Sequence, residues 1–190
     1  MKVDEVAPGL WRWTAPHPEW KQGDDWERDV GCVYYEAPDA TVLVDPLLPA
    51  GAERERFFAA LDRDVERRGL PLAILLTCDW HARSTEELAE RYGATREAPR
   101  GVEAHELPEV EERVWWIPEH GALVPGDVLL GSSEGLSVCP DSWLGERSSP
   151  PSIRAALRPL LDLPAERILV SHGEPVLAGG RAALERALGR

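Results

Sequence analysis

Short apolar runs that stop at turn residues constrain the fold of this chain most strongly. The run Leu72–Thr77 is continuous and too short for a helix, and it therefore predicts a buried, parallel strand. Val30–Tyr35 and Thr41–Val44 predict a hairpin, and Asp45-Pro46 ends the second of its strands. No apolar run approaches the ~20 residues that a transmembrane helix needs. The pattern therefore favours a globular, sheet-containing protein over a membrane protein.

Helical spacing of apolar side chains appears between these strands. Gly51–Arg68 predicts a helix that ends at Gly69, and Ser84–Tyr92 predicts a second one. Two further helices are expected in the last third of the chain, at Ile153–Leu161 and Arg181–Leu188.

The remaining segments are β-rich. A first strand is expected at Leu10–Ala15, and a last one at Ile168–Val170 leads to a His-Gly pair. The middle third predicts an antiparallel meander with the strands Val102–Leu107, Val114–Ile117, Ala122–Val124 and Val128–Leu130. The loop Gly145–Ser152 follows this meander. Two β-rich blocks, each flanked by helices, predict an α/β protein with two packed sheets and helices outside.

Composition excludes several kinds of partner. The 34 acidic and 21 basic residues give a formal net charge of −13 and a pI near 4.8. Such a surface repels phosphate backbones and anionic headgroups, so we expect neither nucleic acid nor membrane partners. Cys32, Cys78 and Cys139 are widely spaced, which favours reduced thiols, and the start of the chain lacks the apolar core of a signal peptide. We therefore expect a cytoplasmic protein, a monomer or homodimer, that binds a small molecule.

Eight tryptophans are unusual for this length, and four of them fall within the first 26 residues: Trp11, Trp13, Trp20 and Trp26. These side chains form either an aromatic flap over the core or the wall of a pocket, and the sequence leaves both interpretations open.

Polar residues follow three of the predicted strands, at Thr77–Arg83, Gly126-Asp127 and Ser171-His172-Gly173. In α/β proteins, polar residues just past the carboxyl ends of strands line the crevice in which ligands bind. Each position has an ordinary structural explanation when taken singly, but together they predict one site.

At this point the chain resembles the metallo-β-lactamase superfamily. Thr41–Pro46 looks like the family's early strand that ends in aspartate, and Ile74–Thr77 looks like the strand before its metal-binding loop. Ile117–Leu129 is similar to the hairpin whose Gly-Asp supplies a metal ligand, and Ile168–Pro175 to the segment that supplies the last histidine. The resemblance covers nearly the whole chain and implies a single domain, residues 1–190, folded as a four-layer αβ/βα sandwich of two mixed sheets with helices outside.

The metal-binding loop departs from the family pattern of His-x-His-x-Asp-His. Cys78, Trp80, Ala82 and Arg83 stand at its four ligand positions. Tryptophan and alanine supply no metal ligand, and a guanidinium opposes a second dication. One hypothesis is that Arg83 pairs with Asp127 in place of a metal.

The family's next histidine also has no clear counterpart. His105 is the nearest candidate, but it lies in a predicted strand without flanking glycines. His120 lies in the hairpin turn, where the resemblance implies no ligand, and we interpret it as structural.

The remaining candidate ligands are compatible with a site for one metal ion. Cys78, His81, Asp127 and His172 offer sulfur, nitrogen and oxygen ligands suited to one zinc ion. His81, Asp127 and His172 are the candidate catalytic residues, and Asp45 is expected to hold the loops near the site. Each also has a structural explanation, such as a buried apolar role for Cys78.

Two functions follow. The first is hydrolysis of a small ester, thioester or amide at an atypical site with at most one metal ion. The alternative is a non-catalytic, metal-free protein that binds a small anion in a crevice formed by Arg83, His81 and His172, with Trp80 also in contact with the ligand. Metal-free catalysis would use His81 or His172 as general base, Arg83 as oxyanion stabiliser and Ser171 as a weak nucleophile candidate.

Overall fold

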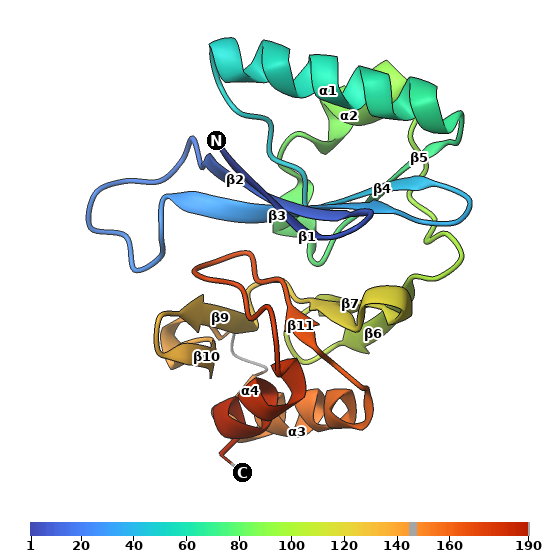
Figure 1. Cartoon of the computed structure of the whole chain (residues 1–190). Coiled ribbons are helices and arrows are strands. Elements are labelled where there is room, and N and C mark those ends of the chain that lie inside the picture. The colour runs from blue at the N-terminus through green and yellow to red at the C-terminus, as the bar shows by residue number, and fades with distance from the viewer. Residues whose placement is uncertain (145–147, 190) are drawn as a thin grey trace. The chain divides into compact units, whose positions relative to one another are not determined.

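The computed structural model of the chain describes residues 1–144 and 148–189 (Figure 1). Its contacts divide the chain into two compact units, Met1–Val102 and Glu103–Arg190. Each unit has its own sheet, its own helices and its own buried apolar cluster. The expectation of a single domain over residues 1–190 stays a prediction.

The first unit contains a five-stranded mixed sheet with the order β1-β2-β3-β4-β5. Its strands are β1 (Lys2–Ala7), β2 (Leu10–Pro16), β3 (Asp29–Glu36), β4 (Thr41–Val44) and β5 (Leu72–Leu75). The first four strands are antiparallel neighbours, and β5 pairs with β4 in parallel, with Val44 opposite Leu75. Because β4 and β5 are parallel, the residues that follow them emerge at the same edge of the sheet.

Two helices cover one face of this sheet, α1 (Ala52–Arg68) and α2 (Thr85–Tyr92) (Figure 1). Helix α1 ends at Gly69, which has φ 60° and donates its backbone N–H to the Val65 carbonyl. Side chains of the sheet and the helices form the buried apolar cluster of the unit, which includes Trp13, Leu43, Leu61, Ile74 and Leu88.

The second unit contains a four-stranded mixed sheet with the order β11-β8-β7-β6 and a separate two-stranded ribbon, β10-β9. Its strands are β6 (Glu103–Leu107), β7 (Glu112–Ile117), β8 (Ala122–Val124), β9 (Leu129–Ser132), β10 (Gly135–Val138) and β11 (Arg167–Ile168). Strand β11 pairs with β8 in parallel, and the other pairs are antiparallel. The helices α3 (Pro150–Leu157) and α4 (Gly180–Ala187) pack on a core that includes Ile153, Leu157 and Leu184.

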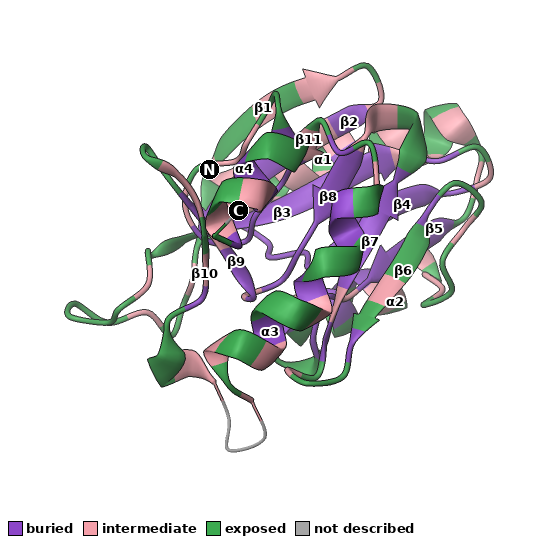
Figure 2. Ribbon diagram, turned by 90° about the horizontal axis from the view of Figure 1, so that it is seen from below, coloured by how far each residue is buried: buried purple, intermediate pink, exposed green. Residues whose placement is uncertain are grey.

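Short 3-10 turns complete the chain: η1 (Asp79–Ala82), η2 (Pro118–His120), η3 (Asp141–Trp143) and η4 (Arg158–Asp162). Burial follows the expected pattern, with β4 and β8 buried along their whole lengths and the helices exposed along part of their surface (Figure 2). Among the described residues, no helix combines the length and the apolar composition needed to cross a bilayer.

The structure confirms a mixed α/β protein with two mixed sheets and helices. Two expectations were wrong in detail. Strand β9 pairs with β10 and does not continue the meander, because a tight turn after Ser132 returns the chain onto β9. Helix α3 begins at Pro150, within the predicted loop, because Ser149 caps it and proline suits the first helical turn. The remainder of that predicted loop includes residues 145–147, which lie outside the described residues.

Candidate functional site

A buried polar cluster follows β4 and β5 in the first unit. The Asp45 carboxylate accepts from the Thr77 backbone N–H at 2.8 Å and from the Thr77 hydroxyl at 2.6 Å. His81 places its Nδ1 at 2.9 Å from Asp45 Oδ2 and at 3.1 Å from Thr77 Oγ1. All three residues are at most 3% exposed. The parallel pairing of β4 with β5 brings them together, as expected for residues at the carboxyl ends of neighbouring parallel strands.

These contacts determine which nitrogen of His81 carries the proton. An ionised carboxylate can only accept hydrogen bonds, so Nδ1 donates its proton to Asp45 Oδ2. In neutral imidazole the other nitrogen, Nε2, is then the unprotonated one. A carboxylate that fixes a histidine through one ring nitrogen is the usual support for a histidine that binds metal or a proton through the other.

Cys78 lies at the start of the 3-10 turn that carries His81. It is 4% exposed, and its carbonyl accepts the His81 backbone N–H at 3.2 Å. Trp80, in the same turn, is 53% exposed, and its ring meets the His81 ring edge-on at 6.5 Å between centroids. The loop therefore buries a thiol and an imidazole and leaves an indole at the surface.

Arg83 closes this loop in a strained conformation. Its φ is 37°, and Asp45 also has a positive φ, of 49°. Residues other than glycine rarely adopt such values, which are common where a site imposes its geometry. Arg83 Nη1 donates to the Asp45 carbonyl at 3.1 Å and approaches the Gly31 carbonyl at 3.4 Å. The guanidinium therefore binds strand ends of its own unit.

The second unit holds its own pair of predicted site residues. His172 Nε2 lies 3.2 Å from Asp127 Oδ1, and the Trp143 ring meets the His172 ring edge-on at 5.6 Å. The His172 side chain is 7% exposed and that of Asp127 is 18% exposed. The structure thus brings together the Gly-Asp and His-Gly motifs, which are 45 residues apart in sequence.

Glu112 supports this pair and was missed by sequence reasoning. Its Oε2 accepts the backbone N–H groups of Asp127 at 2.9 Å and of Val128 at 3.2 Å. Glu112 is 6% exposed. An acidic residue at the start of a strand gives no sign of its burial in the sequence, so no sequence signal identifies it.

Two glycines fix the loop that carries His172. The Gly131 N–H donates to the His172 carbonyl at 3.0 Å. A Cβ at Gly131 would overlap the Glu174 backbone, and a Cβ at Gly173, where φ is 82°, would overlap the Gly131 carbonyl. Only glycine allows this close approach, which explains the glycine of the His-Gly motif in physical terms.

Other candidates lie in ordinary structural settings. His105 lies within β6, and the His120 backbone carbonyl accepts from Arg167 Nη1 at 2.7 Å. Burial lowers the pKa of His120. Burial and the carboxylates of Glu112, Asp127 and Asp141 raise the pKa of the Cys139 thiol to about 11, so this cysteine is protonated at neutral pH.

The four tryptophans of the first 26 residues have different surroundings. Trp11 and Trp13 line a cavity, as the pocket-wall interpretation predicts. Trp20 instead donates its ring N–H to the Trp26 carbonyl at 2.8 Å, in the segment between β2 and β3. His17 meets the Trp26 ring edge-on in the same segment.

Comparisons with solved structures identify the fold. A metallo-β-lactamase from Erythrobacter litoralis aligns with a TM-score of 0.59 and 15% identity, over 98% of this chain and 89% of that one. One from Pontibacter korlensis aligns with a TM-score of 0.53 and 15% identity, over 100% and 99%. A metallo-β-lactamase family protein from Thermus thermophilus aligns with a TM-score of 0.52 and 19% identity, over 96% and 79%.

No family model matches the sequence, and no curated protein matches it either. The structural matches nevertheless extend over nearly the whole chain. The chain therefore has the fold of metallo-β-lactamase family proteins.

Proposed function

We propose that the protein hydrolyses a small ester, thioester or amide at an atypical site that holds at most one zinc ion. The observation that carries this proposal is the buried Asp45–Thr77–His81 cluster, in which Asp45 Oδ2 and Thr77 Oγ1 both lie within hydrogen-bond distance of His81 Nδ1. Burying a carboxylate and an imidazole beside strained backbone costs free energy, and such an arrangement is typical of functional sites.

The donor set fits zinc. Cys78 and His81, in the first unit, offer a sulfur and a nitrogen ligand that a metal ion could take. The family resemblance implies Asp127 as an oxygen ligand and His172 as a further ligand. Zinc bound by three protein ligands would lower the pKa of its water to about 7 and supply the nucleophile for hydrolysis.

The chain's own residues have separate roles in this proposal. Asp45 and Thr77 orient the His81 ring and hold its proton on Nδ1. Glu112 anchors the backbone at Asp127. The exposed Trp80 indole would contact the apolar part of a substrate. A second metal ion is disfavoured because Trp80 and Ala82 supply no ligand and Arg83 is a cation.

The alternative function is metal-free binding of a small anion. The part-buried Arg83 guanidinium favours it, because such a group attracts carboxylates and phosphates. Its contacts with the Gly31 and Asp45 carbonyls occupy part of its donor capacity. We therefore rank metal-free anion binding below hydrolysis.

Metal content tests the proposal. The untagged protein is loaded with zinc, dialysed and measured by plasma mass spectrometry, as wild type and as His81→Ala, Asp127→Ala and His172→Ala. We expect close to one zinc per chain, lost in the three variants and kept in His120→Ala, which serves as the matched control. The zinc form should hydrolyse members of an ester and thioester panel. Absence of zinc after loading, or zinc retained in all the variants, would contradict zinc-dependent hydrolysis at these residues.

A further inference from the structure

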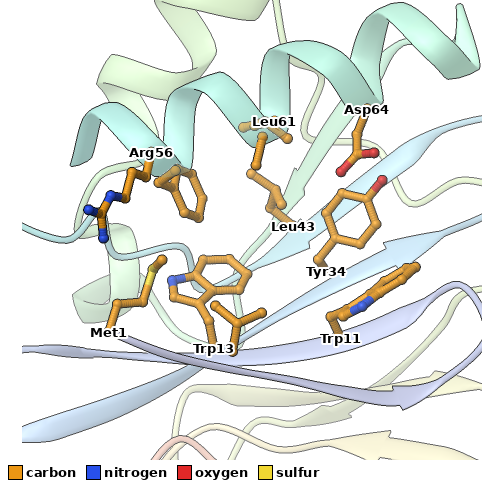
Figure 3. Close-up of a pocket in the computed structure, with 11 residues that line it drawn as sticks. Met1, Trp11, Trp13, Tyr34, Leu43, Arg56, Leu61 and Asp64 are labelled. Atoms are coloured by element: carbon orange, nitrogen blue, oxygen red, sulfur yellow. The ribbon is translucent and has the colours of Figure 1, made fainter. Parts of the chain in front are cut away.

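A cavity of about 230 Å³ lies within the first unit, between α1 and the sheet face that this helix covers (Figure 3). Its walls are aromatic and aliphatic: Trp11 and Trp13 come from β2, Tyr34 from β3, and Phe57 and Leu61 from α1. Trp13 and Tyr34 point from the strands toward α1, and Leu61 points from α1 toward the strands. The cavity shares no residue with the Asp45–Thr77–His81 cluster.

The ring N–H of Trp13 and the hydroxyl of Tyr34 already have partners. Trp13 donates its ring N–H to the Leu47 carbonyl at 3.0 Å, and the Tyr34 hydroxyl lies 3.3 Å from Glu36 Oε1. Burial raises the pKa of Tyr34, so its hydroxyl is neutral. The interior therefore offers apolar contact, and an occupant without polar groups in its body suits it.

Charged side chains mark the two ends of the cavity. Arg56 and Asp64 both lie on α1, eight residues apart, which corresponds to about 12 Å along a helix. Asp64 pairs with Arg67 at 3.1 Å. Arg56 is exposed and makes no hydrogen bond or ion pair with any other residue that the structure describes. The Arg56 guanidinium is therefore the charged group with which a ligand can pair.

Size narrows the ligand class. An apolar cavity of about 150 Å³ holds a benzene ring. A cavity of about 230 Å³ has room for a larger occupant. We propose that this cavity binds an apolar carboxylate, with its chain or ring between the aromatic walls and its carboxylate on Arg56.

The test uses octanoate and 1-octanol, which share a chain length and differ in charge, below the concentration at which octanoate forms micelles. Isothermal titration calorimetry measures both ligands on wild type, Arg56→Glu, Ala60→Leu and Arg63→Glu. Ala60 lines the cavity, so leucine there fills it, whereas Arg63 is an exposed arginine of α1 outside the lining. Near-ultraviolet circular dichroism confirms that each variant is folded.

We expect octanoate to bind at one site per chain. Arg56→Glu should weaken octanoate at least tenfold without weakening octanol, Ala60→Leu should weaken both, and Arg63→Glu should change neither. The absence of saturable octanoate binding would overturn the proposal, as would equal losses in Arg56→Glu and Arg63→Glu. Equal binding of the two ligands, unaffected by Arg56→Glu, would overturn the carboxylate assignment. If Ala60→Leu does not fold, the two arginine variants decide the outcome, because both positions are exposed.

Discussion

Replacing Asp45 by asparagine isolates the interaction on which the candidate site depends. The carboxylate accepts hydrogen bonds from the Thr77 backbone, the Thr77 hydroxyl and His81 Nδ1. Asparagine keeps one acceptor oxygen and replaces the other with a donor, so at least one of these donors loses its partner. An amide nitrogen at the Oδ2 position would face His81 Nδ1 and favour the tautomer protonated on Nε2.

The expected loss of stability in Asp45→Asn follows from the burial and the charge of the Asp45 carboxylate. A hydrogen bond to a charged group contributes about 1.5–3 kcal/mol, and removing a buried charge recovers some desolvation cost. We therefore expect Asp45→Asn to lower the free energy of unfolding by about 2 kcal/mol. For a chain of this length, that corresponds to a fall in Tm of about 4–8 °C. Zinc affinity should fall about 10- to 100-fold, the usual effect of losing a carboxylate that orients a metal-binding histidine.

The assay is a thermal melt by circular dichroism together with a competitive zinc titration. Asp39→Asn is the matched control, because Asp39 is the partly exposed partner of Arg100 at 2.8 Å and contacts no site residue in the part of the chain that the structure describes. We expect no measurable change in its Tm or zinc affinity. Wild-type stability and wild-type zinc affinity in Asp45→Asn would refute the reasoning.

Two further predictions concern the second unit. Gly131→Ala should destabilise the protein by at least about 2 kcal/mol in a denaturant melt, since its Cβ would overlap the Glu174 backbone. At Gly135, where φ is 123°, alanine meets no neighbouring atom and costs only backbone strain, so Gly135→Ala should destabilise the protein less. Cys139 should react with a thiol reagent only as the pH approaches 11, measured as the difference between wild type and Cys139→Ser. Because its pKa is raised in the folded state, its contribution to stability is present below about pH 9 and is lost as the pH rises toward 11. Rapid labelling of folded Cys139 at neutral pH, or equal melts for the two glycine variants, would contradict these expectations.

Local signals in the sequence were sufficient for most of the fold. Continuous apolar runs identified β4 and β5, and the change from apolar spacing to glycine identified the end of α1. Strand β1 was missed because it is a largely exposed edge strand with charged residues, which gives little alternation. Strand β10 was missed because its four residues are glycine, serine and two aliphatic side chains, with none fully buried.

Part of the candidate site could be predicted from the sequence. The family resemblance predicts Asp127 and His172 as site residues, and their side chains lie in contact in the structure. It did not indicate that Thr77 joins Asp45 and His81 or that Glu112 anchors Asp127, because both depend on hydrogen bonds between distant segments. The strain at Arg83 was also beyond reach, since a positive φ at arginine follows from the packing of the loop and not from its composition.

Cobalt substitution tests the central claim, a single metal ion bound through Cys78 and His81, most directly. Cobalt(II) replaces zinc in such sites, and a cysteine thiolate ligand produces a charge-transfer band in the near ultraviolet. We expect one equivalent of cobalt to produce this band in wild type and in Cys139→Ser, and we expect the band to disappear in Cys78→Ser and in His81→Ala. A cobalt complex without the band, or a band that survives Cys78→Ser, would contradict the account.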